Sequence, residues 1–194
     1  MITAKRMSRI KSVVSNRRDD IVLVLEDIHD PHNAAAILRS CDAFGIQHVY
    51  FIFDKTKPYS PKRVGRVSSS SANKWLTYHI FRDTASCYDE LKKEGYKIVA
   101  TILNSEAIPL DSLQLSNQKI ALVLGNEHAG ISQGATDGAD YQVYLPMRGF
   151  VESLNVSVCA AICMYEVVRQ KQSSDHLGLT DEQRETLVED FLQR

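Results

Sequence analysis

Short apolar runs alternate with segments of helical periodicity along most of the chain, and this alternation is the feature that most constrains the fold. Largely apolar runs occupy residues 21–25, 48–53, 97–103, 120–124 and 141–145. Runs of this length without polar alternation are typical of strands that are buried on both faces. Helical patterns occupy residues 31–44, 84–94 and 154–170. Strands and helices in alternation predict an α/β fold with a mostly parallel sheet.

Two charged extensions flank the expected core. Residues 1–20 form a basic arm with a weak helical stripe, and residues 173–194 form an acidic helical tail. In the tail, Thr180 and Gln183 have the spacing of a capping box. We therefore predict one domain at residues 21–172, and we expect the tail to dock on this domain or on a second subunit.

The formal net charge of -1 hides an asymmetry between the two parts of the chain. The first 82 residues hold 14 Lys and Arg against 7 Asp and Glu, whereas the remaining residues hold 9 against 17. Such a split indicates a side that faces a polyanion, although solvated helix faces account for it equally well.

Several classes of protein are excluded by missing patterns. No apolar run approaches the roughly 18 residues of a membrane span, and the first twenty residues lack the apolar core of a signal peptide, so we predict a cytoplasmic protein without a membrane partner. Neither a GxxxxGK[ST] loop nor a GxGxxG turn occurs, which argues against P-loop and Rossmann enzymes. The four cysteines form no CxxC pair, and we expect buried free thiols.

A first polar segment, residues 26–33, follows the strand at 21–25 and leads into a helix. Asp30 can cap that helix, Asn33 lies in its first turn, and Arg39 follows six residues later. Arg39 either reaches the edge of a cleft or is solvated. His29 and His32 could suggest a metal pair, but no third ligand stands nearby, so we predict no metal.

Two further segments place polar residues at the ends of apolar elements. Gly125 and Glu127 follow a buried strand, where glycine lets the backbone approach a ligand closely, although a plain strand–turn–helix connection explains them equally. Ser153 is a candidate N-cap of the helix at 154–170. Asn155 would then lie in the first turn, where asparagine competes with the backbone and is less expected.

Together, the three segments resemble the SPOUT superfamily of RNA methyltransferases, most closely its TrmH branch, over residues 21–170. The resemblance rests on Asn33 with Arg39, on Gly125-Asn126-Glu127, and on Leu145-Pro146-Met147 followed by Ser153-Leu154-Asn155. It implies methyl transfer from S-adenosylmethionine to a ribose 2′-hydroxyl of RNA, a homodimer with the site near the subunit interface, and a C-terminal trefoil knot within residues 101–170.

The resemblance also implies roles for individual residues. The expected catalytic group comprises Arg39, Asn33, Glu127, Ser153 and Asn155. The expected cofactor contacts are Thr101, Leu103, Gly125, Leu145, Met147 and Leu154. A sulfonium methyl group is already activated, so the remaining task is to orient the ribose hydroxyl and to stabilise its developing charge. Arg39 would perform this task as a general base or, with less demand on its acidity, as a cation.

An RNA substrate gives the basic part of the chain a use. The expected RNA-binding residues are Lys5, Arg6, Arg9, Lys11, Lys62, Arg63 and Arg66. The basic arm and residues 30–33 and 153–157 are most similar to the branch that acts on the D-loop guanosine of tRNA. Ribosomal RNA and the tRNA wobble nucleotide are the alternative targets, and a non-catalytic RNA-binding protein with a knotted fold is the alternative of another class.

Overall fold

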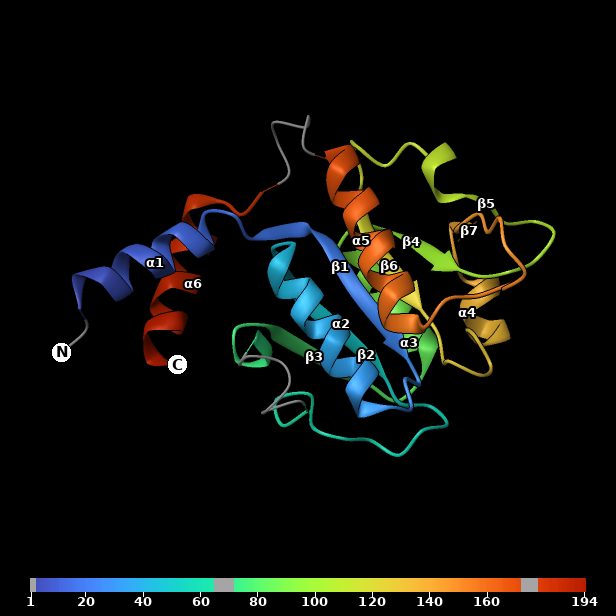
Figure 1. Cartoon of the computed structure of the whole chain (residues 1–194). Helices are drawn as coiled ribbons and strands as arrows, with labels where there is room; N and C mark the ends of the chain where they lie inside the picture. Colours follow the sequence, from blue (N-terminus) through green and yellow to red (C-terminus); the bar gives the residue numbers. More distant parts are fainter. Residues whose placement is uncertain (1–2, 65–71, 172–177) are drawn as a thin grey trace.

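A parallel sheet of seven strands forms the centre of the protein, which a computed structural model describes for residues 3–64, 72–171 and 178–194 (Figure 1). In spatial order the strands are β3 (Thr77–Phe81), β2 (Ile46–Ile52), β1 (Arg18–Glu26), β6 (Lys119–Leu124), β4 (Tyr96–Thr101), β7 (Tyr141–Tyr144) and β5 (Ile108–Pro109). Every pairing is parallel, so all carboxyl ends lie at one edge. The predicted α/β class is confirmed.

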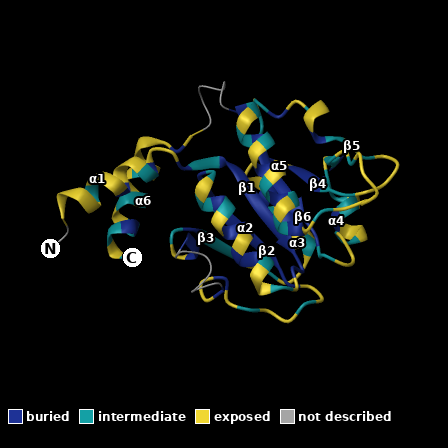
Figure 2. Ribbon diagram, viewed as in Figure 1, coloured by how far each residue is buried: buried dark blue, intermediate teal, exposed yellow. Residues whose placement is uncertain are grey.

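Helices cover both faces of the sheet. On one face lie α2 (Pro31–Ala43) and α5 (Val156–Lys171), and on the other lie α3 (Thr84–Lys93) and α4 (Gln133–Asp137). Successive residues of β1 alternate between the two cores, because side chains along a strand point to opposite faces. The central strands are therefore buried and the outer helix faces are exposed, as Figure 2 shows.

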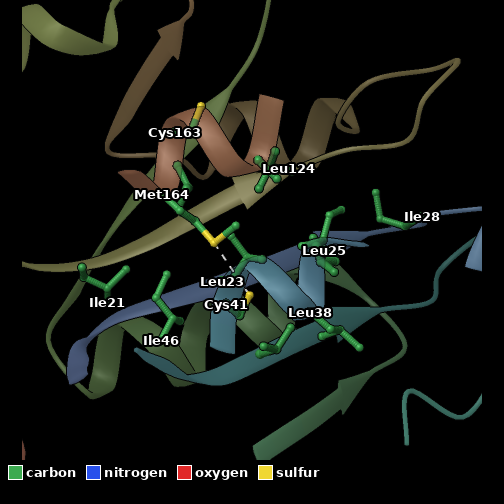
Figure 3. Packing of buried hydrophobic residues seen from close by; sticks show 14 of the residues in the cluster. Ile21, Leu23, Leu25, Ile28, Leu38, Cys41, Ile46, Leu124, Cys163 and Met164 are labelled. Atoms are coloured by element: carbon green, nitrogen blue, oxygen red, sulfur yellow. Dashed lines mark hydrogen bonds between the residues drawn. The ribbon is translucent and has the colours of Figure 1, made fainter. Parts of the chain in front are cut away.

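The core between β1, α2 and α5 is closely packed. Leu23 of β1 belongs to the same cluster as Cys41 of α2 and Met164 of α5, whose sulfur atoms are in contact at 3.7 Å (Figure 3). All four cysteines are free thiols, as predicted. The prediction that all are buried is wrong for Cys159, which is partly exposed because it lies at the wall of a cavity described below.

Local signals set the ends of α2 as predicted. The Asp30 carboxylate accepts a hydrogen bond from the backbone N–H of His32 at 2.8 Å, and Pro31 occupies the first turn. After the helix, Gly45 has a φ of 76°. A Cβ atom there would lie 2.3 Å from the carbonyl oxygen of Asn16, so this turn requires glycine.

The two extensions pack against each other beside the sheet (Figure 1). Helix α1 (Ala4–Val14) buries Ile10 and Val14 against Phe191 of α6 (Asp181–Gln193). Thr180 and Gln183 form the predicted capping box at the start of α6. Strand β1 begins at Arg18, inside the range expected for the arm, and the expected boundary at residue 172 lies outside the described residues.

Several elements differ from the expectation. The sequence patterns missed β3, β5, α4 and the two 3-10 helices η1 (Ala72–Lys74) and η2 (Leu110–Ser112). Helix α5 begins at Val156, so Ser153 is not its N-cap, and Asn155 instead accepts a hydrogen bond from the backbone N–H of Ser157 at 2.9 Å. The trefoil knot stays a prediction. Among the described residues, no helix has the length and apolar character that a membrane span requires.

Candidate active site

The three polar segments meet at the carboxyl edge of the sheet. The side-chain N–H of Asn33 donates to Glu127 at 2.8 Å, and the side-chain N–H of Asn155 donates to the side-chain oxygen of Asn33 at 3.0 Å. The backbone N–H of His29 donates to the other Glu127 oxygen at 3.3 Å. Segments that are 94 and 122 residues apart in the chain are thus joined by one hydrogen-bond chain.

Glu127 accepts these bonds as a carboxylate. Partial burial alone would raise its pKa, but the hydrogen bonds from the Asn33 side chain and from the backbone of residues 127, 29 and 30 outweigh burial, so the pKa is lowered. Both polar atoms of the Asn33 amide are engaged by protein partners. Asn33, Glu127 and Asn155 therefore fix the relative positions of their three segments.

The turn after β6 is held by its own backbone. Asn126 and Gly130 exchange two backbone hydrogen bonds of 2.9 Å, and the Asn126 side chain caps the turn by accepting from the N–H groups of His128 and Ala129. A Cβ atom on Gly125 would lie 2.2 Å from the backbone carbon of Gly130. Only glycine lets the two backbone segments approach this closely.

A cavity of about 590 Å³ lies beside this hydrogen-bond chain, and we call it the strand-end cavity. All six expected cofactor contacts line it, namely Thr101, Leu103, Gly125, Leu145, Met147 and Leu154. Glu127, Ser153 and Asn155 of the expected catalytic group line it as well. Its lining further includes Glu152, Cys159 and Cys163, which the sequence patterns did not single out. The only signal for the cysteines was their position on a predicted helix.

Asn33 and Arg39 are not part of the lining of the strand-end cavity. Asn33 reaches it through Glu127 and Asn155, whereas Arg39 lies on the exposed side of α2. Four of the five expected catalytic residues therefore lie together, either in the hydrogen-bond chain or in the wall of the strand-end cavity. Arg39 lies outside the cavity of its own chain.

The expected RNA-binding residues fall into two groups. Lys5, Arg6 and Arg9 line a shallow cleft on α1 with Lys74, Trp75 and Arg194, and we call it the basic cleft. Lys11 is exposed on the same helix. Lys62 and Arg63 are exposed in a loop that connects β2 to η1, and Arg66 lies outside the described residues. Arg194 was missed because the tail is acidic overall.

No group of three or more His, Cys, Asp or Glu side chains suited to a metal ion occurs in the part of the chain that the structure describes.

The parallel α/β sheet of this chain, with its flanking helices, matches the fold of solved SpoU methyltransferases. The chain belongs to the SpoU rRNA Methylase family, whose profile matches residues 20–165.

Relatives of known name agree with this assignment. The tRNA (guanosine(18)-2′-O)-methyltransferase of Thermus thermophilus is 33% identical over 182 residues, which is 94% of this chain and 90% of the relative. The 23S rRNA (guanosine-2′-O-)-methyltransferase RlmB of Coxiella burnetii is 37% identical over 153 residues, which is 79% of this chain and 60% of that protein.

Two solved structures are similar in fold. The TrmH/SpoU tRNA modifying enzyme of A. aeolicus has a TM-score of 0.83 at 27% identity, covering 97% of this chain and 96% of its own. The SpoU methyltransferase AviRb of Streptomyces viridochromogenes, in complex with AdoMet, has a TM-score of 0.71 at 27% identity, covering 81% and 63%.

Proposed function

We propose that this protein is an S-adenosylmethionine-dependent RNA methyltransferase that modifies the ribose 2′-hydroxyl of guanosine 18 in tRNA. The observation that carries the proposal is the joining of Asn33, Glu127 and Asn155 beside the strand-end cavity. The relative from T. thermophilus is named for the same specificity, and its alignment covers 94% of this chain.

The strand-end cavity suits S-adenosylmethionine. Its volume of about 590 Å³ lies in the range of small-molecule sites. Its lining combines apolar side chains with Glu127 and Glu152, which favour a ligand that carries positive charge. Gly125, whose backbone lies in close contact with that of Gly130, is part of the lining. We infer that the six lining residues from Thr101 to Leu154 hold the cofactor, which supplies an activated methyl group.

We assign positioning, ligand contact and charge stabilisation to different residues of the chain. Asn33, Glu127 and Asn155 act as positioning residues, because their polar groups are engaged with one another. Ser153 lines the cavity and is exposed, so its hydroxyl can reach a ligand. Arg39 is the proposed catalytic residue. As a cation it orients an RNA phosphate and stabilises the charge that develops on the ribose oxygen, so no metal is needed.

We propose a homodimer, because Arg39 lies outside the cavity of its own chain. Helix α5 exposes Val158, Ile162 and Tyr165, which are spaced by four and three residues and so share one face. A partner on this face would bring a second strand-end cavity toward α2. We expect Ile162→Asp to produce monomers in size-exclusion chromatography with light scattering. Ala85→Asp, on the exposed side of α3, is the matched control and should leave the dimer intact.

The RNA would lie over the two basic groups. In the basic cleft, the ammonium group of Lys74 lies 5.0 Å from the ring centre of Trp75, and Arg6 and Arg9 are exposed close by. Cations of this kind track a phosphate backbone. The basic arm would thus form an RNA-binding addition to a domain at residues 21–172, with the acidic helix α6 packed against it, in a cytoplasmic enzyme. The trefoil knot within residues 101–170 is part of the same proposal.

The decisive experiment is methyl transfer from labelled S-adenosylmethionine to unmodified total RNA, followed by mapping of the product. We expect label in tRNA at guanosine 18 and none in a transcript with adenosine at that position. Label confined to ribosomal RNA or to the wobble nucleotide would refute the tRNA assignment. Cofactor binding without any transfer would favour a non-catalytic RNA-binding protein.

A further inference from the structure

Asp27, directly after β1, has an unusual backbone conformation. Among the described residues it is the only non-glycine with a positive φ, which is 50°. Asp and Asn tolerate this left-handed region better than most residues, yet it still costs free energy. Asp27 is also buried. A buried carboxylate in such a conformation persists only when specific contacts hold it.

Those contacts come from a second segment, residues 54–64, which we call the basic loop. The Asp27 carboxylate accepts hydrogen bonds from the backbone N–H of Lys55 at 3.1 Å and from the backbone N–H of Thr56 at 2.9 Å. The Thr56 hydroxyl donates to the Asp27 carbonyl oxygen at 3.3 Å. Asp27 therefore anchors the beginning of the basic loop through both its side chain and its backbone.

Asp27 also contacts the turn that follows β6. The side-chain N–H of Asn126 donates to the Asp27 carbonyl oxygen at 2.7 Å. Asn126 is part of the wall of the strand-end cavity. One residue thus joins the basic loop to the wall of the proposed cofactor site.

The basic loop presents cations near this anchor. Its four basic residues are all exposed, and none of them has an ion-pair partner within the described ranges: Lys55, Lys57, Lys62 and Arg63. Further along the loop, the Tyr59 hydroxyl donates to the Ile28 carbonyl oxygen at 3.2 Å, and the Asn73 amide donates to the carbonyl of Lys62 at 2.8 Å. Hydrogen bonds therefore fix the loop at three points. The first of them is the contact with Asp27, and Lys55 and Lys57 lie beside it.

We propose that Asp27 is a positioning residue for RNA: by anchoring the basic loop beside the strand-end cavity, it holds Lys55 and Lys57 where the substrate's phosphate backbone passes. Asp27 itself touches neither RNA nor cofactor. The inference rests on the proposed function, and it adds a residue that sets RNA affinity through loop geometry.

Asp27→Asn is the sharpest test, because asparagine keeps the shape and tolerates the same φ. It keeps one oxygen that can accept from Thr56, and it replaces the second oxygen, an acceptor for the Lys55 N–H, with a donor that faces that N–H. Asp54→Asn is the matched control, since it removes the same charge from an exposed position in the basic loop. If only charge mattered, both substitutions would strengthen RNA binding, because each removes an acid. If Asp27 positions the basic loop, Asp27→Asn instead weakens RNA binding.

The readouts are the Kd for an unmodified tRNA transcript at several salt concentrations and the Kd for S-adenosylhomocysteine. We expect Asp27→Asn to weaken tRNA binding by about tenfold at low salt. The slope of log affinity against log salt should become shallower by about 1 to 2, as two phosphate contacts are lost. Cofactor affinity should stay within about threefold of the wild type. Asp54→Asn should bind tRNA as well as the wild type or more tightly.

Unchanged or stronger tRNA binding by Asp27→Asn, or an equal loss of tRNA and cofactor affinity, would overturn the proposal. If Asp27→Asn does not fold, Asp27→Gly replaces it, because glycine adopts this φ without strain and also removes the carboxylate. The proposed function is tested separately by the wild type. A wild type that binds neither tRNA nor cofactor refutes the function, whereas a functional wild type with a neutral Asp27→Asn refutes only this inference.

Discussion

Gly125→Ala tests whether the turn after β6 forms the cofactor site. The added Cβ atom would lie 2.2 Å from the backbone carbon of Gly130 and 2.3 Å from the backbone nitrogen of Ile131. Ordinary contacts of a Cβ atom begin at 3.4 Å. The obstructing atoms are backbone, so no side chain can rotate away, and the turn has to retreat by about 1 Å.

The cost of this displacement sets the expected effect on binding. Overpacking of this kind costs about 1–3 kcal/mol, and moving the turn relieves it. A ligand that needs the original turn must restore the strained state, so it loses the same free energy. At 1.4 kcal/mol for each tenfold, we expect the affinity for S-adenosylhomocysteine to fall by about 5- to 150-fold.

Isothermal titration calorimetry measures the loss directly. Gly149→Ala is the control, because it lies in the loop that leads from β7 to α5 and its Cβ would meet nothing within 4 Å. We expect that variant to bind like the wild type. A folded Gly125→Ala protein with cofactor affinity within about twofold of the wild type would show that the turn is not part of the site.

Three further predictions concern single side chains. Arg39→Ala should abolish nearly all methyl transfer to tRNA while calorimetry shows unchanged cofactor affinity, and near-normal turnover would remove Arg39 from the mechanism. Glu127→Gln should lower the free energy of unfolding in urea by about 1 kcal/mol at pH 7. Because the folded-state pKa of Glu127 is lowered, its contribution is present above the ordinary value of 4.5 and is lost as the pH falls below it, so the two proteins should converge in acid. Iodoacetamide should alkylate Cys159 before Cys41 and Cys87 in peptide mapping, because a hydrogen bond from Cys163 lowers the pKa of Cys159 whereas burial raises the pKa of the other two. If Cys159 is alkylated equally fast with and without S-adenosylhomocysteine, it lies outside the bound site.

The strands that the sequence predicted correctly are those with uninterrupted apolar runs. Strands β1 and β6 are buried on both faces, so their composition alone indicates them. Strand β3 lies at the edge of the sheet and is only partly buried, and its five residues, with Thr77 and His79 between apolar ones, contain no uninterrupted apolar run. Its pairing with β2 is a tertiary effect that no local pattern records.

The candidate site was predictable as a set of residues and not as a geometry. Polar residues at the ends of buried strands pointed to Asn33, Glu127 and Asn155, but their hydrogen bonds depend on the order of the strands. The contribution of Arg194 to the basic cleft depends on the packing of α6 on α1. Likewise, nothing in the sequence marks Lys171 as a buried partner of Asp20, at 3.1 Å.

The hydrogen bond between Asn33 and Asn155 has a consequence for synthesis of the protein on the ribosome. Its two partners are 122 residues apart, and the strand that pairs with β1 on the cavity side, β6, also comes late in the chain. Contacts of such long sequence separation form slowly, because a long loop must close first. A nascent chain that ends before Asn155 can pair β1, β2 and β3, but it lacks a complete cavity wall. Because the cavity lining extends to Cys163, cofactor binding becomes possible only once most of α5 has been synthesised, and it can precede the synthesis of α6.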